Sequence, residues 1–393
     1  MILKSTSAGV GFAGTWCRRA HSLCGLLLLA AIVMVCGPAV AEEPDPLAVP
    51  AEFVRMLDVP GSLDDLLRPG KVFYDRAADE LYVADQGNNR LVVFDRNGAY
   101  RFEFPMGEHV GSIADFVVSS SGIIYVLAST RDGYKLMRYD FDGLYLGELG
   151  GDASELPGMH ITTMAIDDRQ RLYLLDESTP RLLRMTPEGT VDLDVPILSD
   201  IDDTTRQELV FGALTIVGDE LLLPASSVGT VYRFDLDGNR TGRFGYKGSA
   251  VGAMNFPVSV GVSGDGLVLV LDKRRFNVLC YTSQGKFVGE FGGKGINPGW
   301  FYFPSSLATD ALGHVYISQV HLNRVQICRV PDSIHDRFLR DRPVDSAQPS
   351  GSGVGYHEHE QNEIEPNGGD ARNNPTLSFN PQHALTNNIK GGL

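Results

Sequence analysis

A four-residue turn motif that returns at almost constant intervals constrains the fold of this chain more than any other feature. Its first copy, Asp95-Arg96-Asn97-Gly98, has the composition of a type I turn followed by a left-handed glycine, which joins two antiparallel strands. Four further copies end at glycines that follow one another after 45, 46, 49 and 47 residues, by subtraction of their positions. They are Asp140–Gly143, Thr186–Gly189, Asp235–Gly238 and Thr282–Gly285. A repeat of this length predicts one unit of structure per copy.

Each turn motif follows short apolar segments with the composition of β-strands. In the first copy these are Leu81–Val83 and Leu91–Phe94, separated by the polar corner Asp85–Arg90. The next four copies have corresponding segments at Ile124–Leu127, Leu172–Leu175, Leu221–Leu223 and Leu267–Val270. A sixth copy, His314–Cys328, lacks the turn. Repeats of about forty to fifty residues with four short strands each are typical of propeller blades, so we predict an all-β, six-bladed β-propeller of four-stranded blades.

The two ends of the repeat region complement each other. The last copy ends at Val330-Pro331 without a fourth strand, whereas Phe53–Gly61 matches the fourth strands Tyr145–Gly150 and Phe287–Gly292. We therefore predict that the N-terminal strand, Phe53 to Leu57, completes the last blade and closes the ring. Closure leaves no open sheet edge to pair with another chain.

The repeat also resembles the NHL repeat. The resemblance is carried by Asp85, the Asn88-Asn89-Arg90-Leu91 corner and Gly98, and it returns at Asn323–Ile327. The lead-in segments Asn255–Pro257 and Gly299–Pro304 fit the same consensus. The match spans about residues 53–331 and is degenerate in blades 2 to 4, where Thr130–Gly133 and Ala225–Gly229 replace the corner. This resemblance implies the six-bladed propeller. It says little about activity, because members of the family share a fold but differ in function.

The segments that flank the propeller suggest an exported protein. Residues 1–41 have the plan of a signal peptide: Arg18 and Arg19, the apolar run Leu23–Val35, and a small-residue cleavage site at Ala39–Ala41. The alternative is a membrane anchor, but the run is shorter than the roughly 20 residues that a span needs. We expect residues 42–52 to be a linker, residues 53–331 the propeller and residues 332–393 a disordered polar tail. The expected location is the periplasm or the cell exterior.

Charge and cysteine content narrow the classes of partner. The chain carries a formal charge of −15, and loss of residues 1–41 removes three basic residues and no acid. Such a chain is a poor match for nucleic acid, whose phosphates require a basic surface. Cys280 and Cys328 remain after export, and we expect two buried free thiols, with a disulfide as the alternative. No Cys-x-x-Cys-His motif for c-type haem occurs, and we expect a monomer without a transmembrane span.

Two groups of residues are candidate binding sites. One face of the propeller carries the corners between second and third strands and the connections between blades; we call it the loop face. The opposite turn face carries the glycine turns. On the loop face we predict a partner-binding surface made of Lys273, Arg274, Arg275, Trp300, Tyr302, Arg324 and Arg90. The alternative is that the repeat arginines bond to carbonyls of neighbouring blades. The second group is a polar channel ring at equivalent first-strand positions, made of Lys71, Asp115, Thr163, Ser259 and Ser306, with Gly212 in blade 4.

The function that these features favour is an exported, non-catalytic scaffold module that binds a protein in the cell envelope and needs no cofactor. NHL-type envelope proteins are sometimes found beside electron-transfer systems, so the resemblance also implies a multihaem cytochrome system as a partner. The alternative is a metal-dependent enzyme, because exported propellers of this kind include zinc-dependent amidating lyases and calcium-dependent lactonases. Candidate zinc ligands are His109, His160 and His321, and candidate calcium ligands are Asp200, Asp202 and Asp203.

Overall fold

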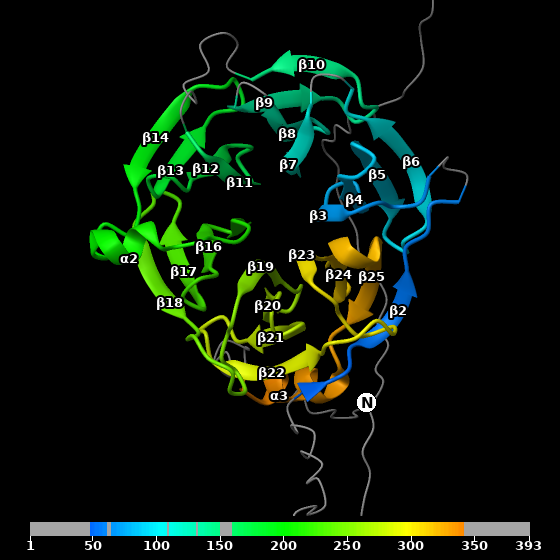
Figure 1. Ribbon diagram of the computed structural model, residues 1–393, viewed down its shortest axis with the longest axis vertical. Coiled ribbons are helices and arrows are strands. Elements are labelled where there is room, and N and C mark those ends of the chain that lie inside the picture. The colour runs from blue at the N-terminus through cyan, green and yellow to red at the C-terminus, as the bar shows by residue number, and fades with distance from the viewer. Residues whose placement is uncertain (1–47, 61–63, 108–109, 131–132, 150–158, 342–393) are drawn as a thin grey trace, which may run out of the picture. The chain divides into compact units, whose positions relative to one another are not determined.

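A computed structural model describes residues 48–60, 64–107, 110–130, 133–149 and 159–341. Within these residues six sheets of antiparallel strands, one of which gains a short parallel strand, stand as blades around a central axis (Figure 1). The first strand of each blade is innermost and the fourth is outermost, except in blade 5, where a short fifth strand lies outside the fourth. The predicted six-bladed β-propeller is confirmed.

The first three blades follow the predicted order of turns. Blade 1 contains β3 (Pro69–Asp75), β4 (Glu80–Asp85), β5 (Arg90–Asp95) and β6 (Tyr100–Pro105). Blade 2 contains β7 (Ser112–Val118), β8 (Ile124–Thr130), β9 (Gly133–Tyr139) and β10 (Tyr145–Glu148). Blade 3 contains β11 (Ile161–Ile166), β12 (Leu172–Asp176), β13 (Arg181–Met185) and β14 (Val191–Pro196).

The other blades include the two that receive strands from the N-terminal segment. Blade 4 contains β15 (Thr215–Val217), β16 (Glu220–Ala225), β17 (Thr230–Asp235) and β18 (Arg240–Phe244). Blade 5 contains β19 (Pro257–Val262), β20 (Val268–Asp272), β21 (Asn277–Tyr281), β22 (Phe287–Gly292) and the added β1 (Ala48–Val49). Blade 6 contains β23 (Pro304–Thr309), β24 (His314–Gln319), β25 (Arg324–Arg329) and β2 (Glu52–Met56).

The N-terminal strand closes the ring, as predicted, by pairing with the third strand of the last blade. Strand β2 runs antiparallel to β25, with Phe53 opposite Cys328 and Arg55 opposite Ile327. The pairing continues past the strand, because the Leu57 N–H donates to the Val325 carbonyl at 3.0 Å. The last blade is therefore built from both ends of the propeller sequence.

The expected linker at residues 42–52 is not all linker. Ala48 and Val49 pair in parallel with Glu290 and Phe291 of β22. The chain then crosses to blade 6, where the Ala51 N–H bonds to the Gly299 carbonyl at 3.3 Å. The N-terminal segment thus joins blades 5 and 6 as well as closing the ring.

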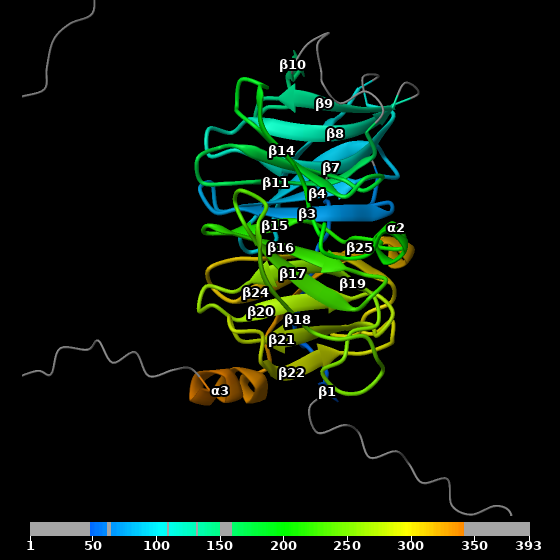
Figure 2. The same ribbon diagram turned by 90° about the vertical axis from the view of Figure 1, so that its left-hand side faces the viewer.

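The boundary of the C-terminal tail is also corrected. Residues Asp332–Asp341 form helix α3, whereas the sequence predicted disorder from residue 332. Helix α3 lies beside β22 of blade 5 (Figures 1 and 2). Ile334 and Phe338, four residues apart, are buried, and Ile334 packs over Gly289 of that strand. The signal peptide expected at residues 1–41 and the tail beyond residue 341 lie outside the described residues. In the described part of the chain, no helix combines the length and apolar character needed to span a membrane.

The five predicted glycine turns are present. Each turn glycine has a positive φ, between 75° for Gly98 and 95° for Gly189. Two requirements select glycine at position 285. Its φ of 81° is unfavourable for other residues, and a Cβ there would lie 2.5 Å from Phe244 of blade 4. The turn therefore closes its own hairpin and packs on the outer strand of the preceding blade.

The aspartate that begins the polar corner of the repeat accepts a hydrogen bond from the backbone. Asp85 accepts the Leu67 N–H at 2.7 Å, and Asp272 accepts the Phe256 N–H at 2.9 Å. In both blades the donor belongs to the connection that enters the first strand. The aspartate at the end of the second strand therefore fixes the path of that connection on the loop face.

Apolar clusters between adjacent blades form the core. One of them, between blades 5 and 6, contains Phe291, Phe301, Ile334 and both cysteines. Cys280 and Cys328 are free and buried, which confirms the prediction of two free thiols. Burial raises the pKa of the Cys328 thiol to about 12, so the thiol stays protonated and behaves as a small apolar group.

Candidate functional site

Four aromatic rings meet on the loop face where blades 5 and 6 adjoin; we call them the loop-face cluster. Phe276 stacks on Tyr302 with centroids 6.1 Å apart, and Tyr302 meets Phe303 edge-on at 4.9 Å. Phe303 in turn contacts the ring of the exposed His321 at 5.3 Å. Phe276, Tyr302 and Phe303 are each only half-buried, so the cluster presents aromatic surface to solvent.

Two members of the cluster have an unusual backbone conformation. Phe276 has a φ of 60° and Phe303 a φ of 46°. The corner positions that correspond to Phe276 in blades 1 and 6 are held by Asn89 and Asn323, with φ values of 49° and 50°. Asparagine tolerates the left-handed region, whereas a bulky residue there costs on the order of 1–3 kcal/mol.

One basic side chain contacts the cluster, and two more belong to the blade 5 corner that carries Phe276. The Lys294 ammonium lies 5.6 Å from the centre of the Phe276 ring, and the Arg274 guanidinium lies 4.6 Å from the Phe256 ring. Lys273 adjoins Arg274 at the same corner. None of these three residues forms an ion pair within the described segments, so their charge is available to a partner. Phe256 also lines the loop-face mouth of the central channel.

The predicted partner-binding residues divide into two groups. Lys273, Arg274 and Tyr302 lie at or beside the cluster, whereas Arg90, Arg275 and Arg324 are used internally. Arg90 bonds to Asp85 and Glu103, Arg275 to both oxygens of Glu290, and Arg324 to the carbonyls of Ile296 and Trp300.

Trp300 belongs partly to each group, because its ring packs internally and is also partly exposed. Its half-buried ring lies against Gly293 and Gly295, where added Cβ atoms would come within 2.4 Å and 2.9 Å of it. Phe301 is fully buried, as the sequence indicated. Trp300 therefore supports the glycine-rich connection and presents part of its ring beside the cluster.

Sequence reasoning missed Phe276, Phe303 and Lys294. A signal for Phe276 was present: in the repeat, Asp272 to Asn277 aligns with Asp85 to Arg90, so Phe276 replaces an asparagine. Nothing comparable marks Phe303, because its contacts join two blades.

The channel-ring residues bond neighbouring blades to one another. Lys71 Nζ lies 2.5 Å from Asp115 Oδ1, and the Thr163 hydroxyl donates to Asp115 Oδ2 at 2.9 Å. Thr163 Oγ1 also accepts the Leu214 N–H at 3.0 Å. These contacts join blade 1 to blade 2, blade 2 to blade 3 and blade 3 to blade 4.

The remaining ring members continue the pattern. The Ser259 hydroxyl accepts the Leu307 N–H at 3.2 Å, and Ser306 Oγ accepts the Val72 N–H at 3.2 Å. Asp115, Thr163, Ser259 and Ser306 are buried. These side chains satisfy the inner edges of the first strands, which is a structural role in the ring.

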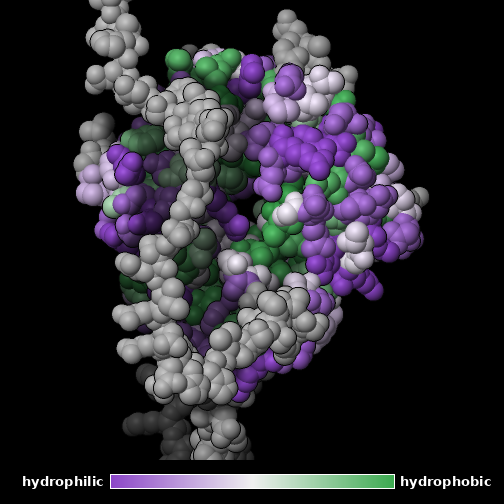
Figure 3. All heavy atoms as spheres, turned by 180° about the vertical axis from the view of Figure 1, so that it is seen from behind, coloured by the Kyte–Doolittle hydropathy of each residue, from purple (hydrophilic) through white to green (hydrophobic). Residues whose placement is uncertain are grey.

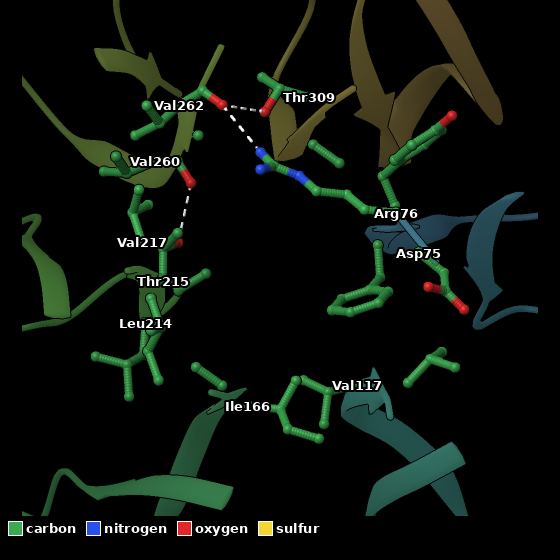
Figure 4. A pocket seen from close by; sticks show the side chains of 18 of the residues that line it. Asp75, Arg76, Val117, Ile166, Leu214, Thr215, Val217, Val260, Val262 and Thr309 are labelled. Carbon is green, nitrogen blue, oxygen red and sulfur yellow. Dashed lines mark hydrogen bonds between the residues drawn. The ribbon is translucent and has the colours of Figure 1, made fainter. Parts of the chain in front are cut away.

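A cavity opens from the channel on the turn face and has a volume of about 400 Å³ (Figure 4). Val117, Ile166, Leu214, Val217, Val260 and Val262 line it. Arg76 follows β3 at its mouth and reaches across to blade 5, where Nη2 donates to the Val262 carbonyl at 3.3 Å. Seen from behind, apolar side chains are visible beside the central hollow, and polar ones cover much of the right-hand side of the view (Figure 3).

The candidate metal ligands are dispersed. His160 in blade 3 lies 4.0 Å from Glu177 and 3.4 Å from the Tyr134 hydroxyl, while His321 belongs to blade 6. His109 lies outside the described residues. Among those that are described, no three histidine, cysteine or acidic side chains are placed to hold a metal ion.

Two of the three candidate calcium ligands bond to other groups of the protein. Asp202 caps the short helix α2 (Asp203–Gln207), accepting the Thr205 N–H at 2.9 Å, and Asp200 pairs with Arg240. The hydrogen bonds from Thr205 to Asp202 lower the pKa of that carboxyl group.

Comparison with known proteins supports the fold. Neither the family models nor the curated proteins compared with this sequence match it. An auxiliary nutrient binding protein from Bacteroides thetaiotaomicron has 12% sequence identity, covers 70% of this chain and 75% of its own, and has a TM-score of 0.53. A structural genomics protein of unknown function from the same bacterium has 13% identity, coverage of 72% and 75%, and a TM-score of 0.51. A gluconolactonase from Xanthomonas campestris has 14% identity, coverage of 72% and 97%, and a TM-score of 0.49. At such identities the similarity concerns the propeller fold alone.

Proposed function

We propose that this protein is an exported, non-catalytic propeller of the NHL type that binds a protein partner through the loop-face cluster. The observation that carries the proposal is Phe276: a strained aromatic residue takes the place of asparagine at the centre of an aromatic and basic surface. Strain of this kind persists where the residue serves a purpose other than stability.

The composition of the surface favours an acidic partner. Half-buried aromatic rings on a rigid scaffold bind with little loss of conformational freedom. Lys273, Arg274 and Lys294 give this part of a chain of formal charge −15 a positive surface. We therefore expect an acidic segment with apolar side chains that fit between the rings, and a multihaem cytochrome of the envelope is the first partner to test.

The proposal is tested by Phe276→Asn, which removes the ring and restores the residue found in blades 1 and 6. We expect an unchanged or slightly higher melting temperature and the loss of partner capture from envelope extracts. Phe141→Asn is the matched control, because Phe141 is 56% exposed in a turn of blade 2 on the opposite face. Loss of capture with Phe141→Asn but not with Phe276→Asn would place the working surface on the turn face.

Charge reversal tests the same surface by a second route. Lys273→Glu with Lys294→Glu should slow association and remove its dependence on salt. Lys286→Glu in the blade 5 turn, where Lys286 pairs with Asp341 in solvent, should have no such effect. A stoichiometric zinc or calcium ion in the purified protein, lost in His160→Ala or His321→Ala, would instead support the metal-enzyme alternative.

A further inference from the structure

We propose that the turn-face cavity is a second binding site, independent of the loop-face cluster, for a small monocarboxylate with an apolar body. The loop face and this cavity lie on opposite sides of the propeller. Evidence for or against one site therefore does not decide the other.

The walls of the cavity suit an apolar ligand. Val117, Ile166 and Val260, with Leu214, Val217 and Val262, come from four of the inner strand regions and surround the space shown in Figure 4. Its volume of about 400 Å³ is within the range of small-molecule sites. The threonines on its wall do not compete for a ligand, because Thr215 and Thr309 donate to the carbonyls of Val260 and Val262.

The inner end of the cavity is electrically balanced. Lys71 is bound to Asp115 at 2.5 Å and donates to the Met164 carbonyl at 3.2 Å. The apolar end of a ligand can therefore lie next to this pair without meeting an uncompensated charge.

The outer end carries a cation suited to a carboxylate. Arg76 is exposed, and its hydrogen bond to the Val262 carbonyl uses one of the five guanidinium N–H donors. It forms no ion pair within the part of the chain that the structure describes. The neighbouring Asp75 accepts the N–H groups of Ala77 and Ala78 at its Oδ1, and among the described residues it forms no ion pair with Arg76. A planar guanidinium binds a carboxylate through two parallel hydrogen bonds.

The acids near the mouth limit the ligand to one negative charge. Asp167 is bound to Arg171 at 2.7 Å, whereas Asp168 is exposed on the rim of the cavity. A second carboxylate on the ligand would face Asp168 and be repelled. A single carboxylate at Arg76, with an apolar chain reaching inward, satisfies both the walls and the mouth.

The experiment measures binding of octanoate, octan-1-ol and octylammonium to the full mature protein by titration calorimetry. We expect octanoate to bind, octan-1-ol to bind more weakly and octylammonium not to bind. Arg76→Gln should weaken octanoate binding by about tenfold and leave octan-1-ol unchanged, because only the charged contact is lost. Arg96→Gln is the matched control: Arg96 lies on the same face of blade 1 but pairs with Asp79 outside the cavity.

A second variant tests whether the ligand binds inside the cavity. Ile166→Trp should fill the space and abolish binding of both octanoate and octan-1-ol, while Phe276-dependent partner capture is kept. No octanoate binding by the wild type at about 10 mM, or equal binding by wild type and Arg76→Gln, would overturn the proposal. Unchanged binding by a folded Ile166→Trp variant would also overturn it. If Ile166→Trp does not fold, the exposed Arg76→Gln substitution remains decisive.

Discussion

At Gly212 the absence of a side chain is a requirement of the ring. The other five blades have a polar or charged side chain at this position, and these side chains bond to a neighbouring blade. In blade 4 the backbone itself makes the contact, because the Ala213 N–H donates to the Val258 carbonyl at 2.8 Å. A Cβ on Gly212 would lie 2.5 Å from the Val258 oxygen.

Gly212→Ala should therefore destabilise the protein by about 1–3 kcal/mol, since backbone of blade 5 would have to move. Gly242→Ala is the control: its nearest neighbour would be the Arg233 side chain at 3.8 Å, so the change should be neutral or slightly stabilising. Denaturant unfolding of the two variants measures the difference. Equal midpoints would show that blade 5 accommodates a methyl group at position 212 and that the contact is not a requirement of the ring.

The corner aspartate of blade 3 predicts a pH dependence. Burial raises the pKa of Asp176, but hydrogen bonds from Ser178, Thr179 and the His160 backbone N–H outweigh it and lower the pKa overall. A lowered folded pKa stabilises the protein above the unfolded value of about 3.9, and this stabilisation is lost as the pH falls through the folded pKa.

We expect Asp176→Asn to cost about 2 kcal/mol at pH 7, and the gap to wild type to narrow below about pH 4. Asp142→Asn, at an exposed turn position, should have little effect at either pH. Denaturation curves collected from pH 3 to pH 7, about one unit apart, provide the measurement. A gap independent of pH would assign the loss to packing instead of charge.

Among the secondary-structure elements, the sequence predicted the strands and turns that belong to the repeat. It did not predict β1 and α3, which depend on contacts with distant parts of the chain. The strands and glycine turns were predictable because each copy carries its own pattern. Strand β1 has only two residues, and its partner β22 lies more than two hundred residues away in sequence. Helix α3 is embedded in a charged segment and presents only Ile334 and Phe338 to blade 5.

In the candidate sites, too, the sequence predicted some residues and missed others. The basic triplet was visible as a cluster, but the sequence could not tell that Arg275 turns inward to Glu290 while Arg274 turns outward to Phe256. The turn-face cavity was missed because its walls come from separate first strands. Arg76, at its mouth, is a single residue after a strand and has no recognisable motif.

Helix α3 provides the prediction at this scale. Phe338 is 3% exposed and the adjacent Leu339 is 47% exposed. Phe338→Ala should destabilise the protein by roughly 3 kcal/mol, or release the helix from blade 5 if the two unfold separately. Leu339→Ala should stay within about 0.5 kcal/mol of wild type. Hydrogen exchange at residues 332–341, compared with thermal unfolding, distinguishes a local loss from a global one.

For the whole molecule, closure couples the two ends of the propeller sequence. The N-terminal segment pairs with blade 6 through β2 and with blade 5 through β1, and Ala51, Leu57 and Val59 are buried along it. A ring closed in this way holds the loop-face cluster rigid, because the cluster lies across the same junction of blades 5 and 6. Stability of the junction and the partner binding proposed for the cluster should therefore be lost together.

Graded truncation tests this coupling. A protein that begins at Ala48 keeps both strands, one that begins at Pro50 lacks β1, and one that begins at Pro60 lacks β1 and β2. We expect a small loss of melting temperature for the second and a fall of about 10 °C or more for the third, because strand pairing and buried apolar groups are lost together. The third protein should also self-associate through the uncovered edge of β25, which light scattering would detect. A monomeric third protein with the melting temperature of the first would show that the ring holds without its N-terminal strand.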